Sequence, residues 1–129
     1  MATTEQINET ISQYLAAFNA NDGDAYVALF TEEATVEDPV GSEVRHGHAG
    51  IAAFWIDVHA LATSIELRAN GPVCAAPPEA AFPIQIITDL GGTKMVLDAT
   101  DVMAFAEDGR IASMRAYWDL AAMRVLDDA

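Results

Sequence analysis

Residues 94–105 read KMVLDATDVMAF, a run in which alternate side chains are apolar, as on a β-strand with one buried face. The residues before this run, LGGT at 90–93, form a hairpin-turn signal, and 81–89 shows a second strand pattern. An Asp-Gly pair at 108–109 marks another turn, after which 110–118 shows a third strand pattern. These segments predict an antiparallel meander in the second half of the chain.

The first half of the sequence has helical periodicity instead. Thr3 and Gln6 have the spacing of a capping box, and apolar side chains follow at helical spacing until near Asn21. The break that follows contains Asp24, which can cap a short second helix. A third helix is predicted over 47–62, where apolar side chains again recur at helical spacing.

Shorter strand patterns lie between and after these helices. Residues 34–38 alternate and are stopped by Pro39, 43–46 can pair back onto them, and 64–69 changes to a period of two. Helices followed by hairpins indicate an α+β architecture. We therefore expect one domain over all 129 residues, with three N-terminal-half helices packed on a curved, mixed and mostly antiparallel sheet.

Composition and charge limit the class of protein. The formal net charge of −14 repels phosphate backbones and anionic membranes, so neither nucleic acid nor a membrane is an expected partner. The start of the chain lacks the basic and apolar regions of a signal peptide, and no apolar run has the length of a membrane span, which predicts a cytoplasmic protein. The single Cys74 cannot form an internal disulfide and is predicted to be a small buried residue.

Sequence signatures of several other enzyme classes are missing. No G-x-S-x-G, G-x-G-x-x-G or P-loop pattern occurs, so serine-hydrolase and nucleotide chemistry have no support. His46, His48 and His59 do not have the spacing of a metal site with other ligands. We expect no metal ion.

Three polar residues fall on faces that the periodicity directs inward. Tyr14 lies in the apolar stripe of the first helix, where it is either an ordinary core residue or a buried hydroxyl donor. Asp101 shares a strand face with apolar residues; it is either a structural aspartate, paired for example with Arg115, or a carboxyl that burial keeps neutral. Asp38 ends the 34–38 strand and is either a turn residue or a carboxylate that reaches a cavity. As a set, two carboxyls and a phenol directed inward indicate acid–base chemistry.

Around these three residues the sequence resembles the ketosteroid isomerase family of the NTF2-like (SnoaL-like) superfamily. The similarity is almost continuous over the N-terminal half and returns in short segments further on; it is carried by YLAAFNA at 14–20, VALF at 27–30, ATVEDPVGSE at 34–43, EAAF at 79–82, Asp101 and SMRA at 113–116. The resemblance implies a cone-shaped NTF2-like fold, a homodimer, a hydrophobic ketosteroid substrate and no cofactor. It also implies that Asp38 is the base and that Tyr14 and Asp101 form the oxyanion hole, a use of a protonated aspartate for which this family is a known example.

The resemblance further implies which side chains wall the steroid pocket. Plain core packing is the alternative for these residues, which are Phe54, Trp55, Phe82, Met114, Ala116 and Trp118. Trp55 stands where family members usually carry a tyrosine that hydrogen-bonds the oxyanion tyrosine, and an indole can donate only through its N–H.

Two other functions remain open from the sequence. One is an enzyme of the same superfamily that acts on another hydrophobic ketone or a terpenoid with the same Asp38 base. The other is a non-catalytic module that binds steroid or lipid, against which the retention of Tyr14, Asp38 and Asp101 argues. The fold alone does not distinguish them, because one fold can carry many functions.

Overall fold

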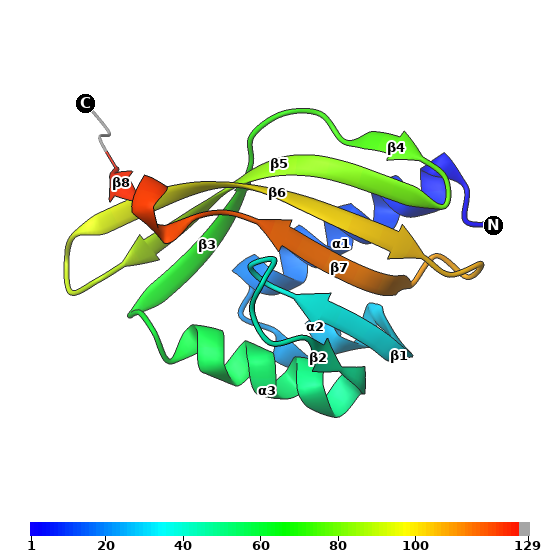
Figure 1. Ribbon diagram of the computed structural model, residues 1–129, viewed down its shortest axis with the longest axis horizontal. Helices are drawn as coiled ribbons and strands as arrows, with labels where there is room; N and C mark the ends of the chain where they lie inside the picture. The colour runs from blue at the N-terminus through cyan, green and yellow to red at the C-terminus, as the bar shows by residue number, and fades with distance from the viewer. Residues whose placement is uncertain (127–129) are drawn as a thin grey trace.

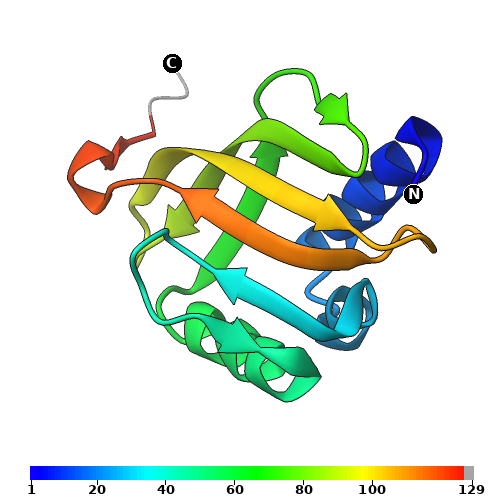
Figure 2. The same cartoon turned by 45° about the vertical axis from the view of Figure 1, so that its right-hand side comes forward.

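The computed structural model describes residues 1–126, in which three α-helices pack against one strongly bent eight-stranded sheet (Figures 1 and 2). The helices pack against the curve of the sheet: α3 lies below it in both views, and α1 runs behind β6 and β7 in Figure 1. The elements are α1 Thr4–Asn19, α2 Gly23–Ala28, β1 Phe30–Glu37, β2 Arg45–His46, α3 Gly47–His59, β3 Ser64–Ala69, β4 Cys74–Ala76, β5 Glu79–Asp89, β6 Lys94–Phe105, β7 Ile111–Tyr117, the 3-10 turn η1 Leu120–Ala122 and β8 Arg124–Val125.

The sheet has the strand order β2-β1-β7-β6-β5-β3, with β4 paired to β5 and β8 paired to β6. All pairs are antiparallel except β1 with β7, which run parallel. The meander β5–β6–β7 predicted from the turn signals is confirmed, and β3 and β6 have the predicted bounds. The α+β prediction with a mixed, mostly antiparallel sheet is therefore correct.

The helix ends differ from the sequence prediction at several places. The capping box of Thr3 and Gln6 is present, with both of its hydrogen bonds formed. The cap of α2 is Asp22 and not Asp24, because the Asp22 carboxylate accepts the Ala25 N–H at 3.0 Å. The first helix stops at Asn19 rather than near Asn21, and α3 stops at His59 instead of reaching residue 62.

The start of one strand and the burial of Cys74 also differ from the prediction. Strand β1 begins at Phe30, four residues before the predicted start at residue 34, because Phe30 pairs with Ile111 of β7 across the parallel part of the sheet. Cys74 is exposed and not buried, since it lies on the short strand β4, which pairs only with β5.

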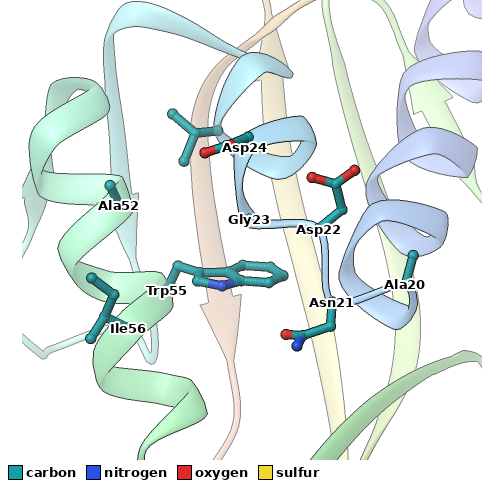
Figure 3. Close-up of a pocket in the computed structure, with 9 residues that line it drawn as sticks. Ala20, Asn21, Asp22, Gly23, Asp24, Ala52, Trp55 and Ile56 are labelled. Atoms are coloured by element: carbon teal, nitrogen blue, oxygen red, sulfur yellow. The ribbon is translucent and has the colours of Figure 1, made fainter.

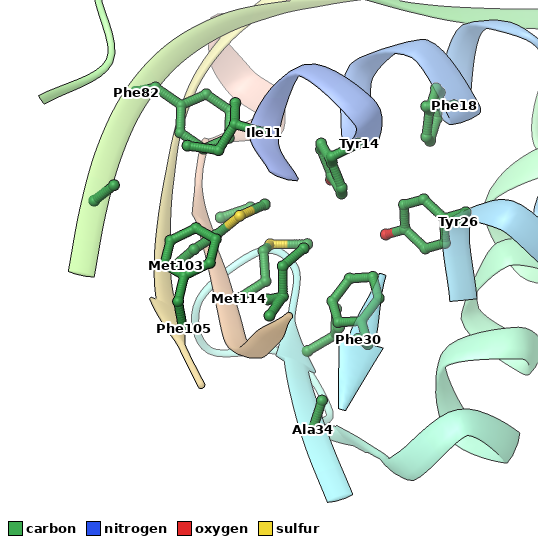
Figure 4. Close-up of a cluster of buried hydrophobic side chains, with 14 of the residues drawn as sticks. Ile11, Tyr14, Phe18, Tyr26, Phe30, Ala34, Phe82, Met103, Phe105 and Met114 are labelled. Carbon is green, nitrogen blue, oxygen red and sulfur yellow. The ribbon is translucent and has the colours of Figure 1, made fainter. Parts of the chain in front are cut away.

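The first helix is held by hydrogen bonds near its middle and at its end. Near the middle, the Thr10 hydroxyl donates to the carbonyl of Gly109, in the β6–β7 turn, at 2.7 Å. At its end, the Asn19 amide donates to the Leu67 carbonyl and accepts the Leu67 N–H, both at 2.8 Å. These contacts set which face of α1 meets the interior, and that face carries Tyr14 into the buried cluster of Figure 4.

Candidate active site

A cavity of about 610 Å³ opens between the helices and the inner face of the sheet. Its wall is mostly apolar, with side chains from α1, α3, β3, β5 and β6 that include Phe18, Phe54, Val58, Ile65, Ile84 and Leu97. Tyr14, Asp38 and Asp101 all line this cavity. The structure thus brings together the three polar residues that the sequence periodicity directs inward.

Three different elements supply these residues. Tyr14 comes from the middle of α1 and is 3% exposed. Asp101 lies in the middle of β6, where it pairs with Phe82 on one side and Ala116 on the other, and is 2% exposed. Asp38 directly follows β1 and is half-buried. Because the sheet bends around the helices, these three residues, which are far apart in the sequence, line one cavity.

Asp101 has the environment of a neutral carboxyl. Its Oδ2 atom is buried and has no hydrogen-bond partner within residues 1–126. Arg115, which could have neutralised it, instead pairs with Glu37 at 2.9 Å and with the Tyr117 hydroxyl. Burial, together with the charge of Asp38, raises the pKa of Asp101 well above its usual range. The structure therefore favours the neutral donor over the paired structural aspartate.

Asp38 has a different environment from Asp101. The Trp118 indole N–H donates to Asp38 Oδ1 at 2.6 Å, which favours the ionised form of the carboxylate. Burial raises the pKa of Asp38, and the Trp118 hydrogen bond opposes that rise. A carboxylate that is partly desolvated and accepts one hydrogen bond is suited to accept a proton.

Tyr14 has a phenol hydroxyl that stays protonated in this cavity. Its pKa is raised, first by burial and then by Tyr26, Asp101 and Asp38. A neutral phenol and a neutral carboxyl in one cavity are two O–H donors. Both line the same cavity as Asp38, and the charge of Asp38 raises the pKa of each.

Tyr26 is a site residue that sequence reasoning missed. It lies in the short second helix, where no sequence pattern marks it as a site residue, yet it lines the cavity and is completely buried. Its ring centroid is 5.3 Å from that of Tyr14 and 4.8 Å from that of Trp55. The signal available in the sequence was a second tyrosine on an inward-facing helix position, but the angle between α1 and α2 decides that the two tyrosines meet.

The predicted pocket residues have three different positions. Phe54 and Trp118 line the cavity. Trp55 instead lines a separate outer pocket of about 560 Å³, between the α1–α2 turn and α3 (Figure 3). The remaining three are buried in the core without being part of the cavity wall; they are Phe82, Met114 and Ala116.

The histidines have hydrogen-bond partners in the backbone. His48 Nε2 lies 2.8 Å from the Phe30 carbonyl, and His59 Nδ1 lies 2.8 Å from the Trp55 carbonyl. Within residues 1–126, no three His, Cys, Asp or Glu side chains are grouped in a way that could hold a metal ion. No helix of the described part of the chain is long and apolar enough to cross a membrane.

Comparisons with known proteins agree with this architecture. A steroid Delta-isomerase from Nocardioides simplex is 37% identical over 113 residues, which are 88% of this chain and 89% of that protein. The solved structure of SalBIII, described as an epoxide hydrolase/cyclase-like enzyme in pyran ring formation in polyether salinomycin, is 28% identical with a TM-score of 0.87, covering 98% of this chain and all of that one. The SnoaL-like domain matches residues 11–114. The chain is therefore a member of the SnoaL-like family within the NTF2-like fold.

Proposed function

We propose that this protein is a steroid Δ-isomerase, which moves the C5–C6 double bond of a 3-oxo-Δ5-steroid to C4–C5. The observation that carries the proposal is the pair of unlike carboxyls in one apolar cavity. The Trp118 N–H donates to Asp38 and favours its ionised form, while Asp101 is buried without a partner on Oδ2 and has a pKa raised well above its usual range. Two titratable groups whose environments separate their pKa values are the pattern of acid–base catalysis. The similarity to a curated steroid Delta-isomerase supports an isomerase.

In the proposed reaction, Asp38 removes a proton from C4 of the substrate. The C4–H electron pair forms the C3–C4 double bond of a dienolate, and negative charge develops on the C3 oxygen. Tyr14 and neutral Asp101 donate hydrogen bonds to that oxygen. Asp38 then returns the same proton to C6, which regenerates the ketone and leaves the double bond between C4 and C5. Since Asp38 returns the proton that it removed, the reaction needs no co-reactant.

The cavity favours this chemistry electrostatically. Donors that are fixed before the reaction stabilise a developing oxyanion more strongly in a dry site than in water, and one such donor contributes on the order of 3 kcal/mol in other enzymes. The burial that raises the pKa of Asp38 also makes it a stronger base toward a weakly acidic C–H. The two effects act on the same step.

The cavity wall supports a hydrophobic substrate. Ligand pockets of a few hundred Å³ with apolar walls and few polar groups suit molecules of drug size, which includes a steroid. In a chain with a net charge of −14, a neutral ketosteroid also avoids repulsion that an anionic substrate would meet.

The similarity to SalBIII supports a second candidate function. An ionised and a neutral carboxyl in one cavity could also activate a hydroxyl and protonate an epoxide oxygen, as ring formation by a cyclase requires. Two other candidates are an enzyme for another hydrophobic ketone or terpenoid and a non-catalytic binding module. All of these candidates use the same cavity; the enzymes differ in their substrate, and the binding module turns over none.

The test is a direct assay with 5-androstene-3,17-dione, in which the absorbance of the conjugated enone product is followed. We expect rapid turnover by the wild type and a loss of at least about a hundredfold in Asp38→Asn, because an amide cannot accept the proton. Asp108→Asn is the matched control, since Asp108 lies in an exposed turn and pairs with Arg110. Steroid binding without turnover would favour the binding module, and an active Asp38→Asn variant would refute the base assignment.

The homodimer and the cytoplasmic location expected from the sequence stay predictions. Sedimentation of the purified protein measures the first, and fractionation of the source cells measures the second.

A further inference from the structure

Tyr26 carries a hydroxyl that the mechanism above does not use. The residue is 0% exposed, and its Oη atom has no hydrogen-bond partner in the described chain. Its ring is held in place by Tyr14, Trp55 and Phe30, with centroid distances of 5.3, 4.8 and 5.2 Å. A phenylalanine would fill the same space without burying a polar atom, so the unpartnered hydroxyl calls for an explanation.

The Tyr26 hydroxyl is directed toward Tyr14. In Figure 4 the Tyr26 oxygen is directed from α2 into the cluster, on the side where Tyr14 lies. Burial raises the pKa of Tyr26; the Tyr14 hydroxyl, acting as a donor toward it, lowers that pKa, and the charges of Asp38 and Asp101 raise it. Among these, Tyr14 is the one whose ring packs against Tyr26.

The Trp55 indole does not face the Tyr14 hydroxyl. Its indole Nε1 faces the start of α2, since a methyl group added at Gly23 would lie 2.8 Å from it. Figure 3 shows the ring between α3 and the α1–α2 turn, lining the outer pocket. The indole N–H is therefore directed away from the cavity that Tyr14 lines, and Tyr26 is left as the hydroxyl beside Tyr14.

We propose that Tyr26 is a positioning residue for Tyr14: its hydroxyl donates to Tyr14 Oη when Tyr14 donates to the substrate oxygen. This inference rests on the proposed isomerase function. In the free protein the two hydroxyls influence each other's pKa, with Tyr14 as the donor, but Tyr26 Oη has no partner at hydrogen-bond geometry within residues 1–126. Catalytic hydrogen bonds often tighten only in the substrate complex. A donor on Tyr14 Oη polarises the Tyr14 O–H and strengthens its bond to the dienolate, because hydrogen bonds in a chain reinforce one another.

The melting temperature and kcat of Tyr26→Phe distinguish a positioning role from a purely structural one. If the hydroxyl mattered for folding, Tyr26→Phe would lower the melting temperature. Because the hydroxyl is buried without a partner, we expect Tyr26→Phe to melt at the same temperature as the wild type or higher. At the same time kcat should fall by about 3- to 10-fold, the worth of one neutral hydrogen bond, while KM stays within about twofold.

A double-mutant cycle tests whether Tyr26 acts through Tyr14. Tyr26→Phe should have no further effect on kcat in the Tyr14→Phe background, where the hydroxyl it supports is already removed. Equal effects in both backgrounds would refute the proposal. Tyr117→Phe is the control for loss of a phenol hydroxyl, because Tyr117 is 44% exposed on β7 and its hydroxyl accepts a hydrogen bond from Arg115, outside the cavity.

A binding measurement separates this inference from the proposed function. A phenolic steroid, estradiol, is bound to the Asp38→Asn variant with and without Tyr26→Phe, and its ionised fraction is read from its ultraviolet spectrum. We expect a smaller ionised fraction when Tyr26 is phenylalanine, because Tyr14 is then a weaker donor to the bound phenolate. If the wild type isomerises steroid but Tyr26→Phe changes neither kcat nor this fraction, the inference alone is overturned. If the wild type does not isomerise steroid, the proposed function fails, and the inference fails with it.

Discussion

Replacement of Asp101 by Asn should change how the stability of the protein depends on pH. In the folded protein, burial and the Asp38 charge raise the pKa of Asp101 well above its usual range. In the unfolded chain the same carboxyl ionises near its ordinary pKa of about 3.9. Above that pH the folded state holds a proton that the unfolded state has released. The free energy of unfolding therefore falls as pH rises, until the folded carboxyl also ionises.

The expected magnitude follows from this linkage. While Asp101 keeps its proton in the folded state, each pH unit lowers the free energy of unfolding by about 1.4 kcal/mol. Asn cannot ionise, so the variant lacks this contribution. The difference in free energy of unfolding, Asp101→Asn minus wild type, should therefore increase by about 2.7 kcal/mol from about pH 5 to about pH 7. The other titrating groups are common to both proteins and cancel in the difference.

Urea unfolding followed by the fluorescence of Trp55 and Trp118 gives the free energy at each pH. The control is Asp108→Asn, whose carboxyl is exposed and should give a curve parallel to that of the wild type. Parallel curves for the wild type and Asp101→Asn would mean that Asp101 is ionised in the folded protein, and the neutral donor would then be refuted.

Two further substitutions test single atoms of the cavity. Trp118→Phe removes the N–H that opposes the burial-driven rise in the pKa of Asp38, so the acidic limb of the kcat/KM profile should move to higher pH, by about 1 to 2 units for a hydrogen bond to a charged group. An unmoved limb would show that this bond does not tune the base. Thr88→Val removes a buried hydroxyl in the cavity wall that has no partner within residues 1–126. Urea unfolding should show a gain of about 1 kcal/mol in stability, and a loss would mean that the hydroxyl is bonded in solution.

The strands were predicted best where both of their ends carry local signals. The β6 strand has the predicted bounds because glycines precede it and an Asp-Gly turn follows it. The start of β1 was missed because its parallel pairing with β7 joins residues about eighty positions apart, which no local pattern contains. The α2 cap was misassigned because Asp22 and Asp24 are equally good caps in sequence, and only the backbone geometry selects one.

The candidate site also divides into residues that local sequence patterns predict and residues that only the packing of distant elements places. Periodicity was enough to direct Tyr14 and Asp101 inward, because each lies within a long regular element. It could not decide whether Asp101 pairs with Arg115, since that depends on which face of the neighbouring strand carries the arginine. Nor could it find Tyr26 or the orientation of Trp55, because both follow from how the short helix α2 packs between α1 and α3.

The Asn19 contact with Leu67 also affects how copies of the protein can associate. Strand β3 lies at one end of the sheet, where unpaired backbone groups would accept a strand from another molecule. The Asn19 carboxamide occupies both outward-facing backbone groups of Leu67, in the middle of that edge. The opposite edge strand, β2, is only two residues long. Asn19 thus hinders the pairing of a further strand at the middle of β3, and β2 offers little edge at the other end, so the fold disfavours growth into open-ended strand-paired aggregates.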